Sequence, residues 1–129
     1  MWMIQPAEGK KGEIIQKLSV VPHIKVWDKT QLPPHYHYGK NKRIYDVIVE
    51  ADAGWGLEVE RRDRRYSPGT HGYDPQNRDM QAIFFAVGPQ FKRGYTQPSF
   101  ANVDLYSLLS RILKIKPTQT DGSLKPVKR

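Results

Sequence analysis

A single histidine stands between two glycines in residues 69–75, whose sequence is Gly-Thr-His-Gly-Tyr-Asp-Pro. His71 carries an imidazole, which is the commonest metal ligand in proteins, but one ligand does not make a site. Gly69 and Gly72 let the backbone adopt conformations closed to other residues, and they let a ligand or metal approach closely. An apolar run follows at residues 83–87. The stretch therefore predicts a loop that holds one imidazole at the edge of a buried strand.

The other residues that could do chemistry have commoner structural explanations. His35 and His37 lie two apart, a spacing that puts both on one side of an extended segment and could serve a metal. Alternating His and Tyr in a proline-flanked loop are more often aromatic packing and exposed polar edges, and we favour that interpretation. We interpret His23 as an ordinary strand residue. Asp52, at the end of a strand, could be a ligand or a catalytic acid, but a turn cap is the commoner role.

The residues taken alone do not spell out a complete active site. The sequence has no phosphate-cradling glycine loop before a helix and no serine or threonine in a nucleophile turn. No second ligand stands at a helical or hairpin spacing from His71. Spacing by itself therefore supports an α/β domain with a functional loop, and nothing more specific.

Composition excludes several classes of protein. The chain has 129 residues, enough for one domain with a buried core. Its 21 Lys and Arg against 13 Asp and Glu give a net charge of +8, which permits attraction to anionic partners such as nucleotides. Apart from residues 61–65 the charges are scattered, so we predict a basic solvated surface and no specific nucleic-acid groove. There is no cysteine, no apolar run near the ~20 residues that span a bilayer, and no signal-peptide pattern at the N-terminus.

Hydrophobic periodicity predicts the elements that must position these residues. Strands are predicted at 23–28, 43–51 and 83–87, with a strand end or extended segment at 2–5 and a possible short return strand at 57–60. Helices are predicted at about 8–18 and about 102–114. The second helix has the wider apolar face, with Asn102 or Asp104 as its N-cap and Pro117 after its end. The polar tail at 118–129 is expected to be frayed. This order predicts an α/β fold with a mixed sheet, flanking helices and strands covered on both faces.

Several motifs together resemble the nucleotide pyrophosphatase/phosphodiesterase family of the alkaline phosphatase superfamily. Residues 69–74 resemble that family's Gly-x-His-Gly-Tyr/Phe-Asp-Asn motif, and residues 98–106 resemble its Pro-Phe-x-Asn-Val-x-x-Tyr helix entry. Further matching positions are Leu32-Pro33, His37-Tyr38, Asn41, Arg43-Ile44, residues 51–55, Met80, Ile83-Phe84, Gly88-Pro89 and Phe91-Lys92. The resemblance covers nearly the whole chain. It implies that residues 1–129 are the C-terminal portion of a catalytic domain, with a partial alkaline-phosphatase-like core.

The resemblance also implies a site. In that family the motif histidine is the last of the ligands to a pair of zinc ions, so His71 is expected to be a zinc ligand. Gly69 and Gly72 are then expected to shape its loop, with Asp74 as a support. The family's nucleophilic threonine and its other zinc ligands lie in segments with no counterpart here, so we expect at most one ligand and an inactive isolated chain. Implied partners are a nucleotide or other phosphodiester substrate and the missing N-terminal part of the domain, in a periplasmic or extracellular setting.

Three departures from the family's pattern indicate a bacterial-type member without disulfides. Pro75 stands where Asn is common, and Ser110 stands where animal members carry a half-cystine. Residues 120–122, Thr-Asp-Gly, replace the usual Asn-Asn-Gly. These departures argue against an animal-type tail domain, and they do not involve His71.

Two hypotheses of different classes follow. The first is a fragment of a zinc-dependent hydrolase of phosphodiester or pyrophosphate bonds, which acts through a threonine-linked intermediate and uses His71 as one ligand. The alternative is a non-catalytic basic module that binds nucleotides or other anions through its Arg and Lys side chains. A third possibility is a truncated product that folds poorly because its strands lack partners.

Overall fold

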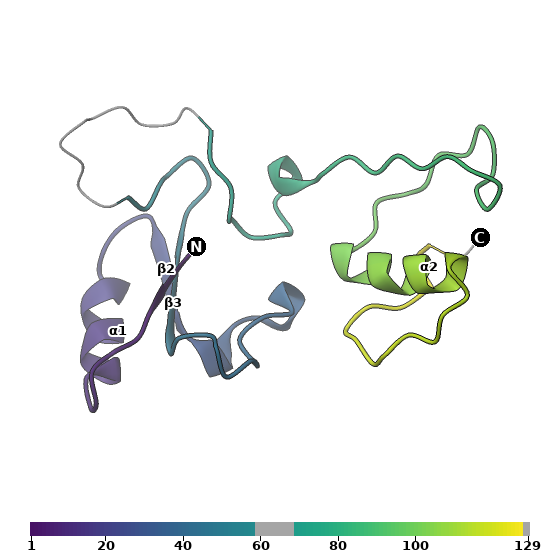
Figure 1. The fold of residues 1–129 in the computed structure, drawn as a ribbon. Helices are drawn as coiled ribbons and strands as arrows, with labels where there is room; N and C mark the ends of the chain where they lie inside the picture. The colour runs from purple at the N-terminus through teal and green to yellow at the C-terminus, as the bar shows by residue number, and fades with distance from the viewer. Residues whose placement is uncertain (59–68, 128–129) are drawn as a thin grey trace. The chain divides into compact units, whose positions relative to one another are not determined.

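The computed structural model describes residues 1–58 and 69–127, so the arginine-rich run at 61–65 lies outside the described residues. Its main elements are β1 (Trp2–Ile4), α1 (Lys11–Ser19), β2 (Ile24–Asp28), β3 (Val47–Ala51) and α2 (Leu105–Ile112), joined by loops and 3-10 turns (Figure 1). The chain divides into two units, Met1–Ala82 with the sheet and Ile83–Arg129 with α2. In the part of the chain that is described, no helix is long and apolar enough to cross a membrane.

A three-stranded sheet forms the centre of the first unit, in the order β1-β3-β2. Val49 of β3 pairs with Trp2 on one side and with Val26 on the other. All five residues of β3 are buried, as expected for a strand covered on both faces. The α/β class is confirmed, but both hydrogen-bonded pairs are antiparallel where a mixed sheet was expected. The reason is that α1 connects two parallel strands, β1 and β2, and β3 is inserted between them.

The first helix begins later than its sequence pattern predicts. Gly9 has a φ of +73°, a left-handed conformation that a helix cannot continue, so α1 starts at Lys11 rather than near residue 8. Ile14, Ile15 and Leu18 are half-buried on one face, as the spacing of three and four predicts. The helix packs against β2, which it thereby holds beside the central strand.

The hydrophobic core of the first unit forms on one face of β3. It contains Leu32, Ile44 and Ile48, with Trp27 and Tyr36 packed against them. The strand predicted from residue 43 begins only at Val47, because a turn precedes it. In that turn the Ile44 amide donates to the Asn41 carbonyl at 3.1 Å, and the Arg43 amide donates to the Asn41 side chain at 2.9 Å.

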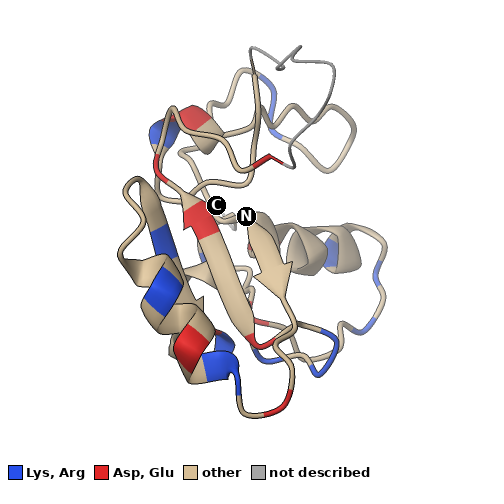
Figure 2. Ribbon diagram, turned by 90° about the vertical axis from the view of Figure 1, so that its left-hand side faces the viewer, with Lys and Arg blue, Asp and Glu red and all other residues tan. Residues whose placement is uncertain are grey.

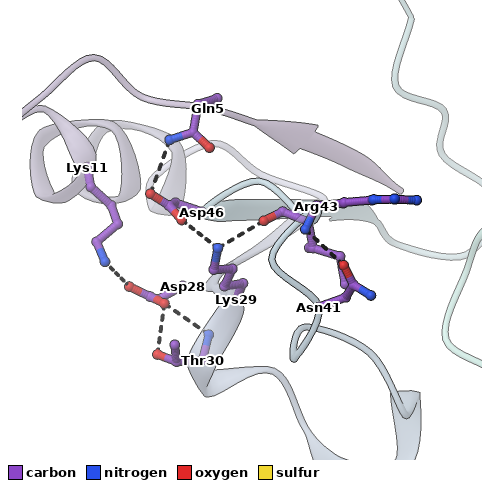
Figure 3. A network of polar contacts seen from close by, with 9 residues as sticks. Gln5, Lys11, Asp28, Lys29, Thr30, Asn41, Arg43 and Asp46 are labelled. Carbon is purple, nitrogen blue, oxygen red and sulfur yellow. Dashed lines mark hydrogen bonds and ion pairs between the residues drawn. The ribbon is translucent and has the colours of Figure 1, made fainter.

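Two ion pairs connect the end of β2 to its neighbours (Figure 3). The Lys11 ammonium of α1 lies 2.6 Å from the Asp28 carboxylate, which also accepts hydrogen bonds from the amide and hydroxyl of Thr30 at 2.9 and 2.8 Å. The Lys29 ammonium lies 2.8 Å from the carboxylate of Asp46, the residue that precedes β3. These contacts join α1, β2 and the start of β3 at one end of the sheet.

The contacts of Asp28 make the free energy of unfolding depend on pH in the acidic range. The Lys11 hydrogen bond, followed by the Thr30 amide, lowers the pKa of Asp28 from 3.8 to about 2. A carboxylate with a lowered folded-state pKa stabilises the fold above its unfolded pKa and loses that contribution as pH falls through the folded value. We expect Asp28→Asn to remove about 1–2 kcal/mol of unfolding free energy at pH 7 and about none near pH 2, measured by urea denaturation. Asp121→Asn, at an exposed position, serves as the control. An equal loss in that variant would show that the effect does not come from the contacts of Asp28.

The second helix agrees with the range predicted for it. A 3-10 turn at Asn102–Asp104 leads into α2, which ends at Ile112, and Lys114 beyond it has a left-handed φ of +56°. The predicted side-chain cap is wrong: the buried Asp104 carboxylate instead accepts from the Ser123 amide at 2.8 Å. Ser110 is buried in the helix, and its hydroxyl has no hydrogen-bond partner among the described residues.

Within the polar tail predicted at 118–129, the described residues 118–127 return to α2 and the loop before it. The Thr118 amide donates to the Tyr106 hydroxyl at 3.1 Å, and the Gln97 side-chain amide donates to the Pro126 carbonyl at 2.9 Å. A Cβ at Gly122 would overlap the backbone of the 3-10 turn before α2, so this position requires glycine. These contacts restrain the described part of the segment, and its fraying stays a prediction.

The strand predicted at 83–87 is not formed. The segment is in no described sheet, and the side chains of Ile83, Phe85 and Val87 are 94%, 84% and 83% exposed. Phe84, in contrast, packs edge-to-face on Phe100 at 5.1 Å between ring centroids. A strand needs a neighbour for its N–H and C=O groups, and none pairs with this segment in the described chain. Likewise Leu57 and residue 58 form no strand, and residues 59–60 lie outside the described range.

Candidate functional site

The loop that carries His71 leads into a turn at 74–77. Gly72 has a φ of +92°, and a Cβ there would lie 2.9 Å from the Met1 backbone nitrogen, so a side chain is disfavoured for two reasons. The Met1 ammonium donates to the Gly72 carbonyl at 3.2 Å, which holds the loop beside β1. A Cβ at Gly69 would meet open space. Glycine is therefore required by geometry at Gly72, and the shaping role of Gly69 stays a prediction.

His71 is exposed and lines an open hollow of about 270 Å³ in the first unit. Three aromatic residues, Trp2, Trp55 and Tyr73, contribute to the same lining. The Tyr73 hydroxyl donates to the Trp55 carbonyl at 2.7 Å and so connects the His71 loop to the turn after β3. Within residues 1–58 and 69–127, no group of three or more His, Cys, Asp or Glu side chains is placed to hold a metal. The site thus presents one accessible imidazole rather than a complete coordination shell.

Asp74 organises the turn that follows His71. Its carboxylate oxygen Oδ1 accepts from the Gln76 amide at 2.8 Å, and its carbonyl accepts from the Asn77 amide at 2.9 Å. The same Oδ1 lies 3.0 Å from Nε2 of His35. Burial alone would raise the pKa of Asp74, but the Gln76 amide and then His35 outweigh burial and hold that pKa below its usual range. Asp74 is therefore a carboxylate at neutral pH, bound on two sides.

A hydrogen bond of Tyr36, the neighbour of His35, connects this turn to the sheet. The Tyr36 hydroxyl donates to the Glu50 carboxylate at 2.7 Å, and Glu50, in the middle of β3, is only 1% exposed. The His35 ring lies tilted on the Tyr36 ring, with 4.5 Å between centroids. Burial, followed by the Glu50 and Asp74 carboxylates, raises the pKa of Tyr36 far above its usual range. Tyr36 consequently remains a protonated hydrogen-bond donor.

The one-sided arrangement that could have let His35 and His37 share a metal, which was the less favoured interpretation, is absent. Residues Pro34–Tyr36 form a 3-10 turn, and His37 ends it in a left-handed conformation with φ of +49°. The one-sided spacing of an extended segment is therefore lost, and His35 bonds to Asp74. Its contact with the Tyr36 ring confirms the preferred interpretation of aromatic packing.

His23 and Asp52 have structural roles that the sequence did not indicate in full. His23 is not an ordinary strand residue: it precedes β2 with a φ of +63°, and its ring stacks on Trp55 at 3.8 Å with a 6° interplanar angle. The Asp52 carboxylate lies 3.7 Å from His23 Nδ1. The turn after β3 is closed by the backbone, where the Trp55 amide donates to the Asp52 carbonyl at 2.9 Å. Asp52 thus acts with His23 rather than as a side-chain cap.

The structure brings together a cluster that sequence reasoning missed. His35, Tyr36, Glu50 and Asp74 meet between β3 and the turn after His71. One signal was visible in the sequence, since Glu50 is the only charged residue in an otherwise apolar strand. A buried carboxylate requires a hydrogen-bond donor, and a nearby tyrosine is a suitable one.

A comparison with protein families identifies the chain. Residues 5–74 match the family model described as type I phosphodiesterase/nucleotide pyrophosphatase. The chain belongs to this family. The match includes α1, the strands β2 and β3, and the loop through His71 to Asp74, so the resemblance drawn from the motifs is confirmed.

Family relatives of known sequence match most of the chain. Human ectonucleotide pyrophosphatase/phosphodiesterase family member 5 is 36% identical over 121 residues, which is 93% of this chain and 25% of the relative. A bovine bis(5'-adenosyl)-triphosphatase is 34% identical over 88% of this chain and 25% of its own length. A venom phosphodiesterase of Naja atra is 39% identical over 78% of this chain and 12% of its own length. The chain therefore spans about a quarter or less of these relatives.

Solved structures of the family have the same fold. The human family member 5 superposes with a TM-score of 0.84 at 35% identity, over 96% of this chain and 33% of that one. The murine protein, solved as an inactive variant in complex with AMP, gives a TM-score of 0.82 at 33% identity, over the same shares. This agreement confirms the partial alkaline-phosphatase-like core expected from the sequence.

Proposed function

We propose that this chain is the C-terminal portion of the catalytic domain of a zinc-dependent hydrolase of phosphodiester or pyrophosphate bonds, in which His71 is one metal ligand. The supporting observation is the placement of His71 in a chain of this family. It is exposed at an open hollow, on a loop shaped by Gly72 and anchored by Asp74. A histidine that merely held its own loop would be expected to turn inward and bond to it.

The residues present fit a share of a zinc site and not a whole one. Zinc sites use three or four protein ligands, and His71 can supply one of these. The remaining ligands and the nucleophile would come from parts of the catalytic domain that this chain does not span. In the complete site, zinc would act as a Lewis acid on the phosphoryl oxygens. The isolated chain is therefore expected to be inactive.

The relatives suggest substrate and location. Some are named for ectonucleotide pyrophosphatase, bis(5'-adenosyl)-triphosphatase or venom phosphodiesterase activity, and one murine structure contains AMP. We propose that the complete protein acts on nucleotides or related phosphodiesters outside the cytoplasm, in the periplasm or the extracellular space. The basic character of the chain, +8 overall, would favour such anionic substrates.

The ligand role is tested in a chimera in which this chain replaces the matching third of the human family member 5. We expect zinc-dependent turnover of a chromogenic nucleotide phosphodiester by the chimera and none by the isolated chain. His71→Ala should lower kcat/KM by about 100-fold or more, because one of the zinc ligands is lost. His37→Asn suits the left-handed backbone at that position and serves as the control, with activity within about twofold of the parent.

Two results would contradict the proposal. Turnover by the isolated chain with zinc would show that its site is complete, and full activity of the His71→Ala chimera would remove His71 from the ligand set. The alternative, a basic binding module, predicts AMP binding by the isolated chain that weakens with salt and persists after chelation and in His71→Ala. Figure 2 shows Lys and Arg on α1 and on several loops of the described chain. The hydrolase remains our proposal because it also accounts for the exposed His71 in a chain of this family.

A further inference from the structure

A contact between distant parts of the sequence holds the turn after His71. The His35 imidazole and the Asp74 carboxylate are 39 residues apart in sequence and 3.0 Å apart in space. Their side chains are only 30% and 28% exposed, so water screens the pair less than it would screen an exposed one. The Asp74 oxygen that contacts His35 also accepts the Gln76 amide. The position of the turn and the position of His35 are therefore coupled through one oxygen atom.

His35 is connected to the sheet through Tyr36. It belongs to the same 3-10 turn as Tyr36, and the two rings are 4.5 Å apart. The Tyr36 hydroxyl is hydrogen-bonded to Glu50, which is buried in the central strand. A continuous series of contacts therefore runs from β3 through Tyr36 and His35 to Asp74. Its last member is three residues from His71.

We propose that His35 is a positioning residue, which fixes the His71 loop against the central strand by holding Asp74. An effect of His35 on zinc binding by His71 rests on the proposed function. The restraint of the His71 loop by His35 does not. Without His35, Asp74 would keep its bond to the Gln76 amide, so the turn would still close. The turn would lose its link through Tyr36 to the middle of β3. The hydrogen bonds of Tyr73 to Trp55 and of Met1 to Gly72 would be left to hold the loop. We expect the turn, and His71 with it, to become more mobile.

The restraint is tested in the 129-residue chain by amide hydrogen exchange and ¹⁵N relaxation. In His35→Ala, exchange at Gln76 and Asn77 should accelerate by about tenfold, while the amides of β3 change by less than about twofold. His35→Arg supplies a cation that can reach the same carboxylate, and it should restore the slower exchange. His37→Asn is the matched control in the same turn and should leave all of these amides unchanged.

A second measurement separates positioning from general stability. In the chimera, His35→Ala should raise the zinc concentration for half-maximal activity by about tenfold with little change in activity at saturating zinc, and His35→Arg should reverse the effect. Unchanged exchange at Gln76 and Asn77 in His35→Ala, or an equal acceleration in His37→Asn, would overturn the proposal. If the turnover of every chimera is independent of zinc, the proposed function fails. The hydrogen-exchange experiment still decides the role of His35.

Discussion

Gly39→Ala is expected to lower the free energy of unfolding by about 3 kcal/mol, a large part of the stability of a small domain. Gly39 has a φ of +102°, and a Cβ there would overlap the backbone carbonyl oxygen of Lys29. Lys29 cannot retreat, because its amide donates to the Asp46 carbonyl at 3.0 Å and its ammonium lies 2.8 Å from the Asp46 carboxylate. The strain of a positive φ in the Gly39→Ala variant and the displacement of Lys29 from Asp46 would therefore both lower the free energy of unfolding. Urea denaturation followed by tryptophan fluorescence measures the loss.

Gly54→Ala is the matched control for this prediction. Gly54 also has a positive φ, +86°, but a Cβ there would meet nothing within 4 Å. Its substitution should therefore cost only the backbone strain, about 1 kcal/mol. An equal loss at Gly39 and Gly54 would show that the overlap with Lys29 contributes nothing.

Tyr36→Phe is expected to cost about 3 kcal/mol of unfolding free energy, because it removes a donor from a buried carboxylate. Glu50 is 1% exposed in the central strand and accepts the Tyr36 hydroxyl at 2.7 Å. The ring of Phe would keep the packing against the core, so the lost hydrogen bond dominates. Chemical denaturation at neutral pH measures this effect.

A double-mutant cycle isolates that hydrogen bond. In a Glu50→Gln background the buried group is neutral, and Tyr36→Phe should then cost only about 1 kcal/mol. The difference between the two backgrounds is the coupling of Tyr36 to the charge of Glu50. Equal costs in both backgrounds would assign the loss to the packing of the ring instead.

Local patterns predicted much of the fold. The alternation of Ile24 and Val26 and the apolar run in β3 produce strands where expected, since their side chains fit the two faces of a small sheet. The apolar face of α2 likewise predicts a helix that is present. Strand direction could not be predicted in this way, because it depends on the insertion of β3 between β1 and β2. The pairing of β1 with β3 joins residues far apart in sequence, such as Trp2 and Val49, which a local pattern cannot reveal.

The site was predicted only in part for the same reason. The glycines and Asp74 around His71 are close in sequence, so a motif can reveal them. The partner of Asp74 is His35, which lies 39 positions away in a segment that sequence analysis interpreted by its own neighbours. Left-handed backbone at His37 was equally hidden, since a non-glycine residue gives little sign that it will adopt a positive φ.

We expect the exposed segment at 83–87 to promote association of this chain at high concentration. Ile83, Phe85 and Val87 present a strip of exposed apolar side chains on extended backbone that belongs to no described sheet. Such a strip is a template for edge-to-edge pairing with other molecules, and a net charge of +8 opposes that association only through long-range repulsion. Added salt screens the repulsion and leaves the apolar attraction intact. We therefore expect the colloidal stability of this 129-residue chain to be greatest in dilute, low-salt solution.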